Sequence, residues 1–121
     1  MDPEQSRTIV VADDDENMRT LVVRILSAEG FQVLTAEDGR QAIALIKQQP
    51  CYALVTDLEM PEQEGIETIR EIRKSHPNLH IVVISGASLI DVQAAVMLGA
   101  TVAVLKPFSR EQLVAAVRGL P

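Results

Sequence analysis

The sequence predicts an α/β fold in which helices cover both faces of a parallel β-sheet. Three observations predict it: five short apolar runs, helical apolar spacing between consecutive runs, and Gly or Pro where the helices should end. The runs are Thr8–Ala12, Phe31–Ala36, Tyr52–Thr56, Ile81–Ile84 and Val102–Leu105. Short runs rich in Val and Ile are typical of strands buried on both faces. Gln32 interrupts the second run, which predicts an edge strand. Alternation of strand and helix implies a parallel sheet with right-handed crossovers.

Apolar residues recur at intervals of three and four between these runs, which is typical of amphipathic helices. The stripes are Met18, Leu21, Val22, Ile25 and Leu26; Ala42, Leu45 and Ile46; Ile66, Ile69 and Ile72; Val92, Ala95, Val96 and Leu98; and Leu113, Val114 and Val117. Gly30 and Gly99 stand where the first and fourth helices should end. Pro50 and Pro77 follow the second and third helices.

Length and composition indicate one domain with an aliphatic core. A chain of 121 residues is the size of a single domain, so we expect residues 1–121 to form one unit. Apolar residues make up 47 % of the chain but aromatic residues only 2 %, so Val, Ile, Leu and Ala must fill the core. The single cysteine, Cys51, permits no intramolecular disulfide and is expected to be a small buried thiol.

Charge and hydropathy exclude several classes of partner. The chain carries 11 basic and 17 acidic side chains, for a net charge of −6. We therefore expect no direct binding to nucleic acid and no attraction to an anionic membrane. The first eight residues lack the apolar segment of a signal peptide, and no apolar run is long enough to span a bilayer. These features predict a cytoplasmic protein.

Polar residues follow the strands at the edge where ligands bind in open α/β sheets. They are Asp13, Asp14 and Asp15 after the first strand, Asp57 after the third, Ser85 after the fourth and Lys106 after the fifth. Crowded carboxylates repel one another unless a cation or protons neutralise them, and oxygen ligands favour Mg²⁺. An aspartate beside Mg²⁺ can act as a nucleophile toward a phosphoryl group. A lysine and a hydroxyl would then balance the charge of that group.

Each of these residues taken alone also has a structural interpretation. Asp15 is expected to cap the following helix rather than bind a ligand. Asp57, Ser85 and Lys106 alone would be ordinary loop or turn residues. Their joint placement after four strands favours a functional site.

The sequence resembles the receiver domains of two-component response regulators along the whole chain, from about Arg7 to Leu120. The stretches that carry the resemblance are Ile9–Asp15 with Arg19, Thr56–Pro61 with Gly65, Ile81–Ala87, and Gly99–Ala100 leading to Leu105–Phe108. The resemblance implies a flavodoxin-like (βα)5 fold with strand order 2-1-3-4-5. It further implies a phosphoprotein switch rather than an enzyme, one that catalyses only its own phosphorylation and dephosphorylation.

By the same resemblance, Asp57 accepts a phosphoryl group from a histidine kinase or a phosphotransfer protein, with Mg²⁺ required. Asp14 would bind the metal directly, Asp13 through water, and Glu59 through its backbone carbonyl. Ser85 and Lys106 would contact the phosphoryl oxygens, and the bond between Lys106 and Pro107 is expected to be cis. A downstream output domain or protein is implied as a partner. Relatives commonly form homodimers through the fourth helix, fifth strand and fifth helix.

One position departs from the family pattern. Receiver domains usually carry Tyr or Phe three residues before the lysine, and here that residue is Ala103. We therefore expect the signal to pass mainly through the loop after Ser85 and the fourth helix.

Three other functions compete with this interpretation. A phosphatase with an aspartate nucleophile would use an Asp-x-Asp motif after the first strand, which Asp13 and Asp15 satisfy, but it would not need the stretch around Asp57. A flavin-binding electron carrier would need a Ser/Thr/Gly-rich phosphate loop and aromatic residues around the ring, but the loop here is Asp-rich and the chain has few aromatic residues. A pseudo-receiver that only binds protein would not need the acidic pair, the acceptor and the lysine.

Overall fold

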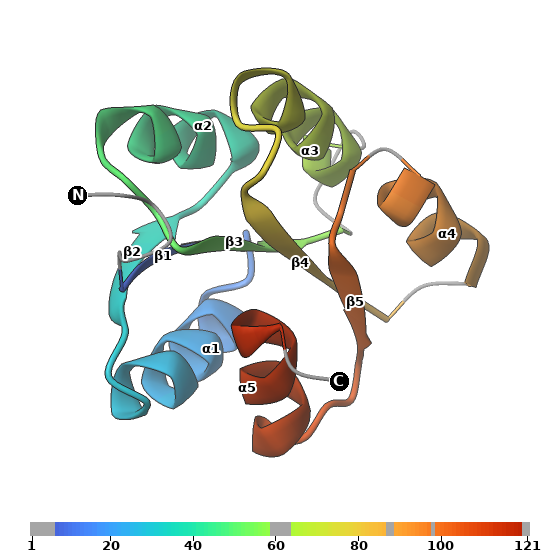
Figure 1. The fold of residues 1–121 in the computed structure, drawn as a ribbon. Coiled ribbons are helices and arrows are strands. Elements are labelled where there is room, and N and C mark those ends of the chain that lie inside the picture. The colour runs from blue at the N-terminus through green and yellow to red at the C-terminus, as the bar shows by residue number, and fades with distance from the viewer. Residues whose placement is uncertain (1–6, 59–63, 87–88, 98, 120–121) are drawn as a thin grey trace.

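The computed structural model describes residues 7–58, 64–86, 89–97 and 99–119. Five strands alternate with five helices (Figure 1). The strands are β1 (Thr8–Ala12), β2 (Gln32–Ala36), β3 (Ala53–Asp57), β4 (His80–Ser85) and β5 (Val102–Leu105). The helices are α1 (Glu16–Ala28), α2 (Gly39–Gln48), α3 (Glu64–Ser75), α4 (Leu89–Met97) and α5 (Arg110–Arg118). Among the described residues, no helix is both long and apolar enough to cross a membrane.

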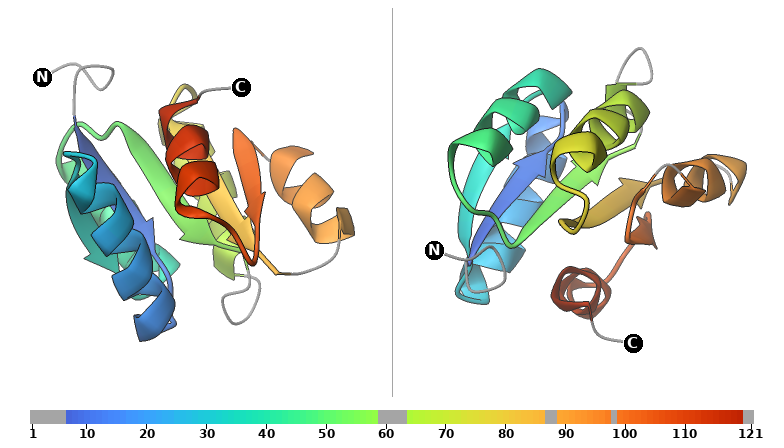
Figure 2. Two further views of the ribbon diagram at one scale, coloured as in Figure 1. Left: turned by 90° about the horizontal axis from the view of Figure 1, so that it is seen from below. Right: turned by 45° about the horizontal axis from the view of Figure 1, so that its top comes forward.

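All pairs of neighbouring strands are parallel, in the order β2-β1-β3-β4-β5, which confirms the predicted topology. Helices α2, α3 and α4 cover one face of the sheet, and α1 and α5 cover the other (Figures 1 and 2). β2 lies at an edge, as Gln32 indicated, and only its last residue, Ala36, is buried.

Alternation along each strand divides the core into two layers. In β1, Val10 and Ala12 pack with α2 and α3, whereas Ile9 and Val11 pack with α1 and α5. β3 and β4 contribute to both layers in the same way, which explains why their sequences are continuous apolar runs rather than alternating ones.

Strand boundaries differ from the predicted runs by one residue where the pairing extends onto polar side chains. Asp57 pairs with Ile84, and Ser85 pairs with Leu105, so each belongs to its strand. The backbone hydrogen-bonding pattern decides the strand end, and side-chain polarity does not.

The stripe predicted for α1 is wrong at one position. Val22 and Leu26 are fully buried, but Leu21 is 44 % exposed. Adjacent residues on a helix point about 100° apart, so Leu21 lies at the flank of the face centred on Val22. Cys51 is buried as expected, and burial raises the pKa of its thiol.

Candidate functional site

The register of β1 and β3 brings two of the predicted carboxylates side by side. Ala12 pairs with Thr56, so Asp13 and Asp57 are the next residues on adjacent strands. Both are buried, with exposed fractions of 2 % for Asp13 and 4 % for Asp57. Parallel pairing therefore forces two acidic side chains into a poorly hydrated edge of the sheet.

The register on the other side of β3 adds the hydroxyl and the ammonium group. Asp57 pairs with Ile84, which makes Ser85 the next residue on β4. Ser85 is fully buried, and its carbonyl accepts a hydrogen bond from the Lys106 N–H at 2.8 Å. Lys106 is thereby held at the same edge, directly after β5.

Three carboxylates converge at this edge. Ligand oxygens of Asp13, Asp14 and Asp57 all lie within 4.8 Å of one another, and Asp14 is exposed to solvent. We refer to these three residues as the acidic cluster. Its hard oxygen donors, two buried and one open to water, fit Mg²⁺, which binds proteins through few carboxylates and keeps several waters.

The electrostatics of Asp13 reflect this crowding. Burial raises its pKa from 3.8 to about 6, and the neighbouring charges of Asp57 and Asp14 act in the same direction. Two groups oppose that rise: the Asp15 N–H, which donates to Asp13 Oδ1 at 2.9 Å, and the Lys106 ammonium. A dication bound at the acidic cluster would offset the negative charges of its carboxylates.

Lys106 faces the predicted acceptor. Its Nζ lies 3.5 Å from Asp57 Oδ2, and its side chain is 25 % exposed. The peptide bond between Lys106 and Pro107 is cis, as the resemblance implied.

Asp15 and Arg19 organise the loop after β1 instead of joining the acidic cluster. Asp15 caps α1 by accepting a hydrogen bond from the Asn17 N–H at 2.9 Å, which confirms the structural interpretation. Arg19 donates from Nη1 to the carbonyl oxygen of Asp13 at 2.8 Å. The position of Asp13 is therefore fixed from both its backbone and its side chain.

Gly65 is a positioning residue whose role the sequence pattern does not reveal. A Cβ at this position of α3 would lie 2.7 Å from the carbonyl oxygen of Asp57 and 2.9 Å from that of Leu58. Only a glycine lets α3 approach the end of β3 this closely. What the sequence does show is a glycine near the start of a predicted helix, although glycine has a low helix propensity.

The remaining predicted ligand, Glu59, lies outside the described residues. Four of the six predicted site residues, Asp13, Asp14, Asp57 and Lys106, thus lie within 4.8 Å of another member of the site. Ser85 is placed beside them by the strand register.

Comparison with known proteins identifies the family of the chain. The family model described as "Response regulator receiver domain" matches residues 9–118. The transcriptional regulatory protein CpxR of Klebsiella pneumoniae is 37 % identical over 112 residues, which cover 93 % of the chain and 48 % of CpxR. The chain thus spans about half the length of this curated relative.

Solved structures show the same fold. The chemotaxis protein CheY4 of Vibrio cholerae superposes with a TM-score of 0.87 at 26 % identity, covering 96 % of this chain and 99 % of CheY4. A beryllofluoride-activated NtrC4 receiver domain dimer superposes with a TM-score of 0.86 at 30 % identity, covering 93 % and 94 % of the two chains. With the strand order, the acidic cluster and the match over residues 9–118, the chain belongs to the receiver domains of two-component response regulators.

Proposed function

We propose that Asp57 is the phosphoryl acceptor of this receiver domain. The observation that carries the proposal is the surroundings of its carboxylate, which lies within 4.8 Å of the Asp13 and Asp14 ligand atoms and 3.5 Å from Lys106 Nζ. An Asp57 oxygen would attack the phosphorus of a phosphohistidine on a histidine kinase or phosphotransfer protein. The new P–O bond forms as the P–N bond breaks, and the departing imidazole keeps the electron pair and takes up a proton.

We propose that Asp13, Asp14, Asp57 and the Glu59 carbonyl hold Mg²⁺ during this transfer. The bound ion would offset the negative charge of the carboxylates and of the incoming phosphoryl oxygens. Lys106 stands where its ammonium can pair with the phosphorylated Asp57, and the Ser85 hydroxyl follows β4 where it can donate to a phosphoryl oxygen. Both residues stabilise charge without forming covalent bonds, so the domain would catalyse only its own phosphorylation and dephosphorylation.

Mass spectrometry after incubation with phosphoramidate and Mg²⁺ tests this assignment, because phosphoramidate carries the P–N bond of a phosphohistidine. The wild type should gain one phosphoryl group, and Asp57→Asn should gain none. Asp15→Asn is the matched control, since asparagine also caps helices and Asp15 does not belong to the acidic cluster. Chelation of Mg²⁺ should abolish the gain. Phosphorylation of Asp57→Asn at the wild-type rate would overturn the assignment.

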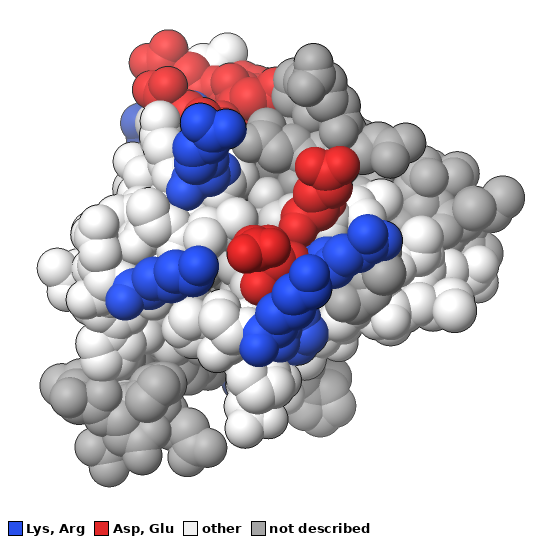
Figure 3. All heavy atoms as spheres, turned by 90° about the horizontal axis from the view of Figure 1, so that it is seen from above, with Lys and Arg blue, Asp and Glu red and all other residues white. Residues whose placement is uncertain are grey.

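We further propose that residues 1–121 form a single receiver domain that acts on a downstream output domain or protein in the cytoplasm. CpxR is a transcriptional regulatory protein of about twice this length. Direct nucleic-acid binding is not expected of the domain itself, because its net charge is −6. Over the α2–α3 face, Lys and Arg side chains lie in separate groups next to Asp and Glu rather than in one continuous basic patch (Figure 3).

We propose that the signal passes mainly through the loop after Ser85 and α4, because Ala103 stands where receiver domains usually carry an aromatic residue. Ala103 is half-buried on the same side of the sheet as Ala95 of α4, where it packs against the core without the bulk of an aromatic ring. Beryllofluoride should therefore shift the amide resonances of residues 85–98 more than those of β5. Unchanged resonances in that segment would contradict the route.

The face formed by α4, β5 and α5 is the proposed homodimer surface. Val96, Met97 and Leu105 are 46 %, 87 % and 54 % exposed, and the related NtrC4 receiver forms a beryllofluoride-activated dimer. Sedimentation should detect a dimer with beryllofluoride that Met97→Glu weakens. A monomer at high concentration in the activated state would exclude it.

A further inference from the structure

A groove of about 750 Å³ opens at the amino-terminal edge of the sheet, at the opposite end of β3 from Asp57. The segment between α2 and β3 forms one wall, and the turn between α3 and β4 forms another. Arg118 at the end of α5 closes the third side. The groove therefore shares no residue with the acidic cluster and is not explained by phosphoryl transfer.

The charge of the groove is opposite to that of the domain. Its lining contains Lys47, Arg118, His76 and His80, and it contains no aspartate or glutamate among the described residues. The chain as a whole has a net charge of −6, so Lys47 and Arg118 beside a concavity that no described carboxylate lines define a local positive site. Such a site favours an anion.

Part of the lining of the groove is apolar. Tyr52 and Leu79 line it together with Pro50 and Pro77. Tyr52 is half-buried, with its ring centroid 5.4 Å from that of Phe31, so its orientation is fixed by packing. An aromatic ring and proline rings offer flat surfaces against which a planar group can pack.

Side-chain hydrogen bonds to backbone carbonyls hold the wall between α3 and β4 in place. Arg73 Nη1 donates to the carbonyl oxygens of His76, Pro77 and Leu79 at 2.9, 3.0 and 2.8 Å. The His80 Nε2 lies 2.7 Å from the carbonyl oxygen of Ala116 in α5. This wall is thus formed before any ligand binds, which lowers the entropic cost of binding.

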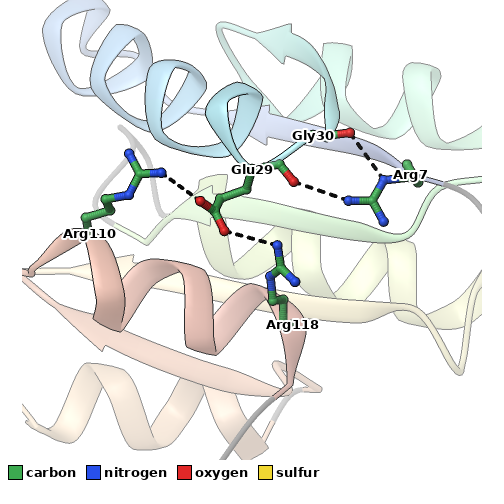
Figure 4. Close-up of polar contacts among 5 residues, drawn as sticks. All are labelled: Arg7, Glu29, Gly30, Arg110 and Arg118. Atoms are coloured by element: carbon green, nitrogen blue, oxygen red, sulfur yellow. Dashed lines mark hydrogen bonds and ion pairs between the residues drawn. The ribbon is translucent and has the colours of Figure 1, made fainter.

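Arg118 retains positive character despite its ion pair. Its Nη2 lies 3.0 Å from Glu29 Oε1, but Glu29 Oε2 lies 2.7 Å from Arg110 (Figure 4). Arg7 adds a third guanidinium, which donates to the carbonyl oxygens of Glu29 and Gly30. One carboxylate side chain is therefore shared by two arginines, and an excess of positive charge remains beside the groove.

We propose that this groove binds a small organic anion with a flat apolar body, of the aromatic carboxylate or sulfonate class. Its volume falls within the roughly 300–1,000 Å³ typical of small-molecule sites. The apolar part of the lining would contact the planar body, and Lys47 and Arg118 would attract the anionic group. The proposal is independent of Asp57, because the two sites lie at opposite edges of the sheet.

Anilinonaphthalene sulfonate is the probe, and uncharged phenylnaphthylamine is its neutral counterpart. Titration followed by fluorescence and by amide chemical shifts should show saturable binding of the sulfonate, with shifts concentrated in residues 46–52 and 76–80. Lys47→Glu should weaken this binding by roughly threefold to tenfold. Lys74→Glu should not change it, since Lys74 is also an exposed lysine in the last turn of its helix but does not line the groove.

The outcomes distinguish binding in the groove from binding elsewhere on the domain. Asp57→Asn should bind the probe as the wild type does, so a failure of the phosphorylation proposal would leave this one standing. Equal affinity for the neutral counterpart would overturn the proposal, because the cations would then contribute nothing. Shifts at Val96, Met97 and Leu105 in place of the groove residues, or no saturable binding, would overturn it as well.

Discussion

The two edges of the sheet treat buried charge in opposite ways. At the carboxyl edge, Asp13 and Asp57 are buried next to each other, and burial raises the pKa of Asp13 to about 6. At the amino edge, Arg73 is partly buried, and its guanidinium is surrounded by backbone carbonyls that accept its hydrogen bonds. The first arrangement leaves negative charge that a ligand can neutralise, whereas in the second the backbone carbonyl dipoles stabilise the positive charge within the fold.

This difference shows where the fold stores reactivity and where it gains stability. A charged group surrounded by hydrogen-bond partners stabilises the loops that it joins. Like charges forced together destabilise the fold until a cation or a proton arrives. Removing charge should therefore have opposite effects on stability at the two edges, which variants can test.

The largest effect is expected at Arg73. Arg73→Met keeps most of the aliphatic stem but leaves the carbonyls of Leu79 and Gly99 without their charged donor. We expect the free energy of unfolding to fall by about 3 kcal/mol, since several charge-assisted hydrogen bonds are lost together. Urea unfolding measures this change. Phosphorylation of the folded fraction should be unaffected.

Arg70→Met is the matched control, because Arg70 is an exposed arginine on the same helix. Its effect should stay within about 0.5 kcal/mol. Equal destabilisation by the two substitutions would mean that Arg73 acts only through helix propensity, and the contrast between the edges would fail.

Arg73 also illustrates what the sequence does not predict. The strands follow from their Val- and Ile-rich runs, and the carboxyl-edge site follows from one rule of open sheets together with the family motifs. Arg73 stands beside the apolar stripe of Ile69 and Ile72, yet nothing in the sequence indicates that its partners include Gly99, 26 residues further along. Contacts set by loop geometry have no periodic signal.

The same limit applies to the groove and to the ion pairs around Glu29. Glu29 is separated in sequence from Arg110 by 81 residues and from Arg118 by 89. Such distant contacts leave no repeating pattern in the sequence. Only the packing of α5 against α1 brings these charges together. The exposure of Leu21 is hidden from the sequence for a related reason, since an apolar stripe shows the direction of a helix face but not the width that the sheet covers.

Asp13→Asn should have the opposite sign to Arg73→Met. The pKa of Asp13 is higher in the folded state than in the unfolded state, so the folded state favours the protonated acid. The contribution of Asp13 to the free energy of unfolding is therefore fully present below pH 3.8 and is lost as the pH rises through about 6. Asn resembles the protonated acid and can still accept the hydrogen bond from Asp15. Relative to the wild type without metal, the variant should gain about 2 kcal/mol between pH 4 and pH 7.

Mg²⁺ provides the control for this gain. Millimolar Mg²⁺ should stabilise the wild type at pH 7 and stabilise Asp13→Asn much less, because binding to the native state alone raises stability. Unfolding curves at several pH values, with and without Mg²⁺, measure both effects. A difference between the two proteins that does not vary with pH would show that ionised Asp13 carries no penalty, and the comparison of the edges would lose its basis.

The smallest effect is expected at Glu29, where two opposing contributions nearly cancel. Its carboxylate pairs with Arg110 and Arg118, whose side chains are 47 % and 39 % exposed, so each pair contributes little. Glu29 is also the C-cap of α1, where a negative charge is unfavourable to the helix dipole. Glu29→Gln should therefore lower the free energy of unfolding by only about 0.5 kcal/mol at low ionic strength.

Salt decides whether that small loss arises from the ion pairs. Screening at about 1 M salt should remove most of it, because the exposed pairs lie within reach of mobile ions. Glu71→Gln on the exposed surface of α3 provides the baseline for a carboxylate with no ion pair among the described contacts. A loss that persists in high salt would mean that Glu29 stabilises the amino edge by packing against its neighbours, and charge there would matter only at the carbonyl-lined site of Arg73.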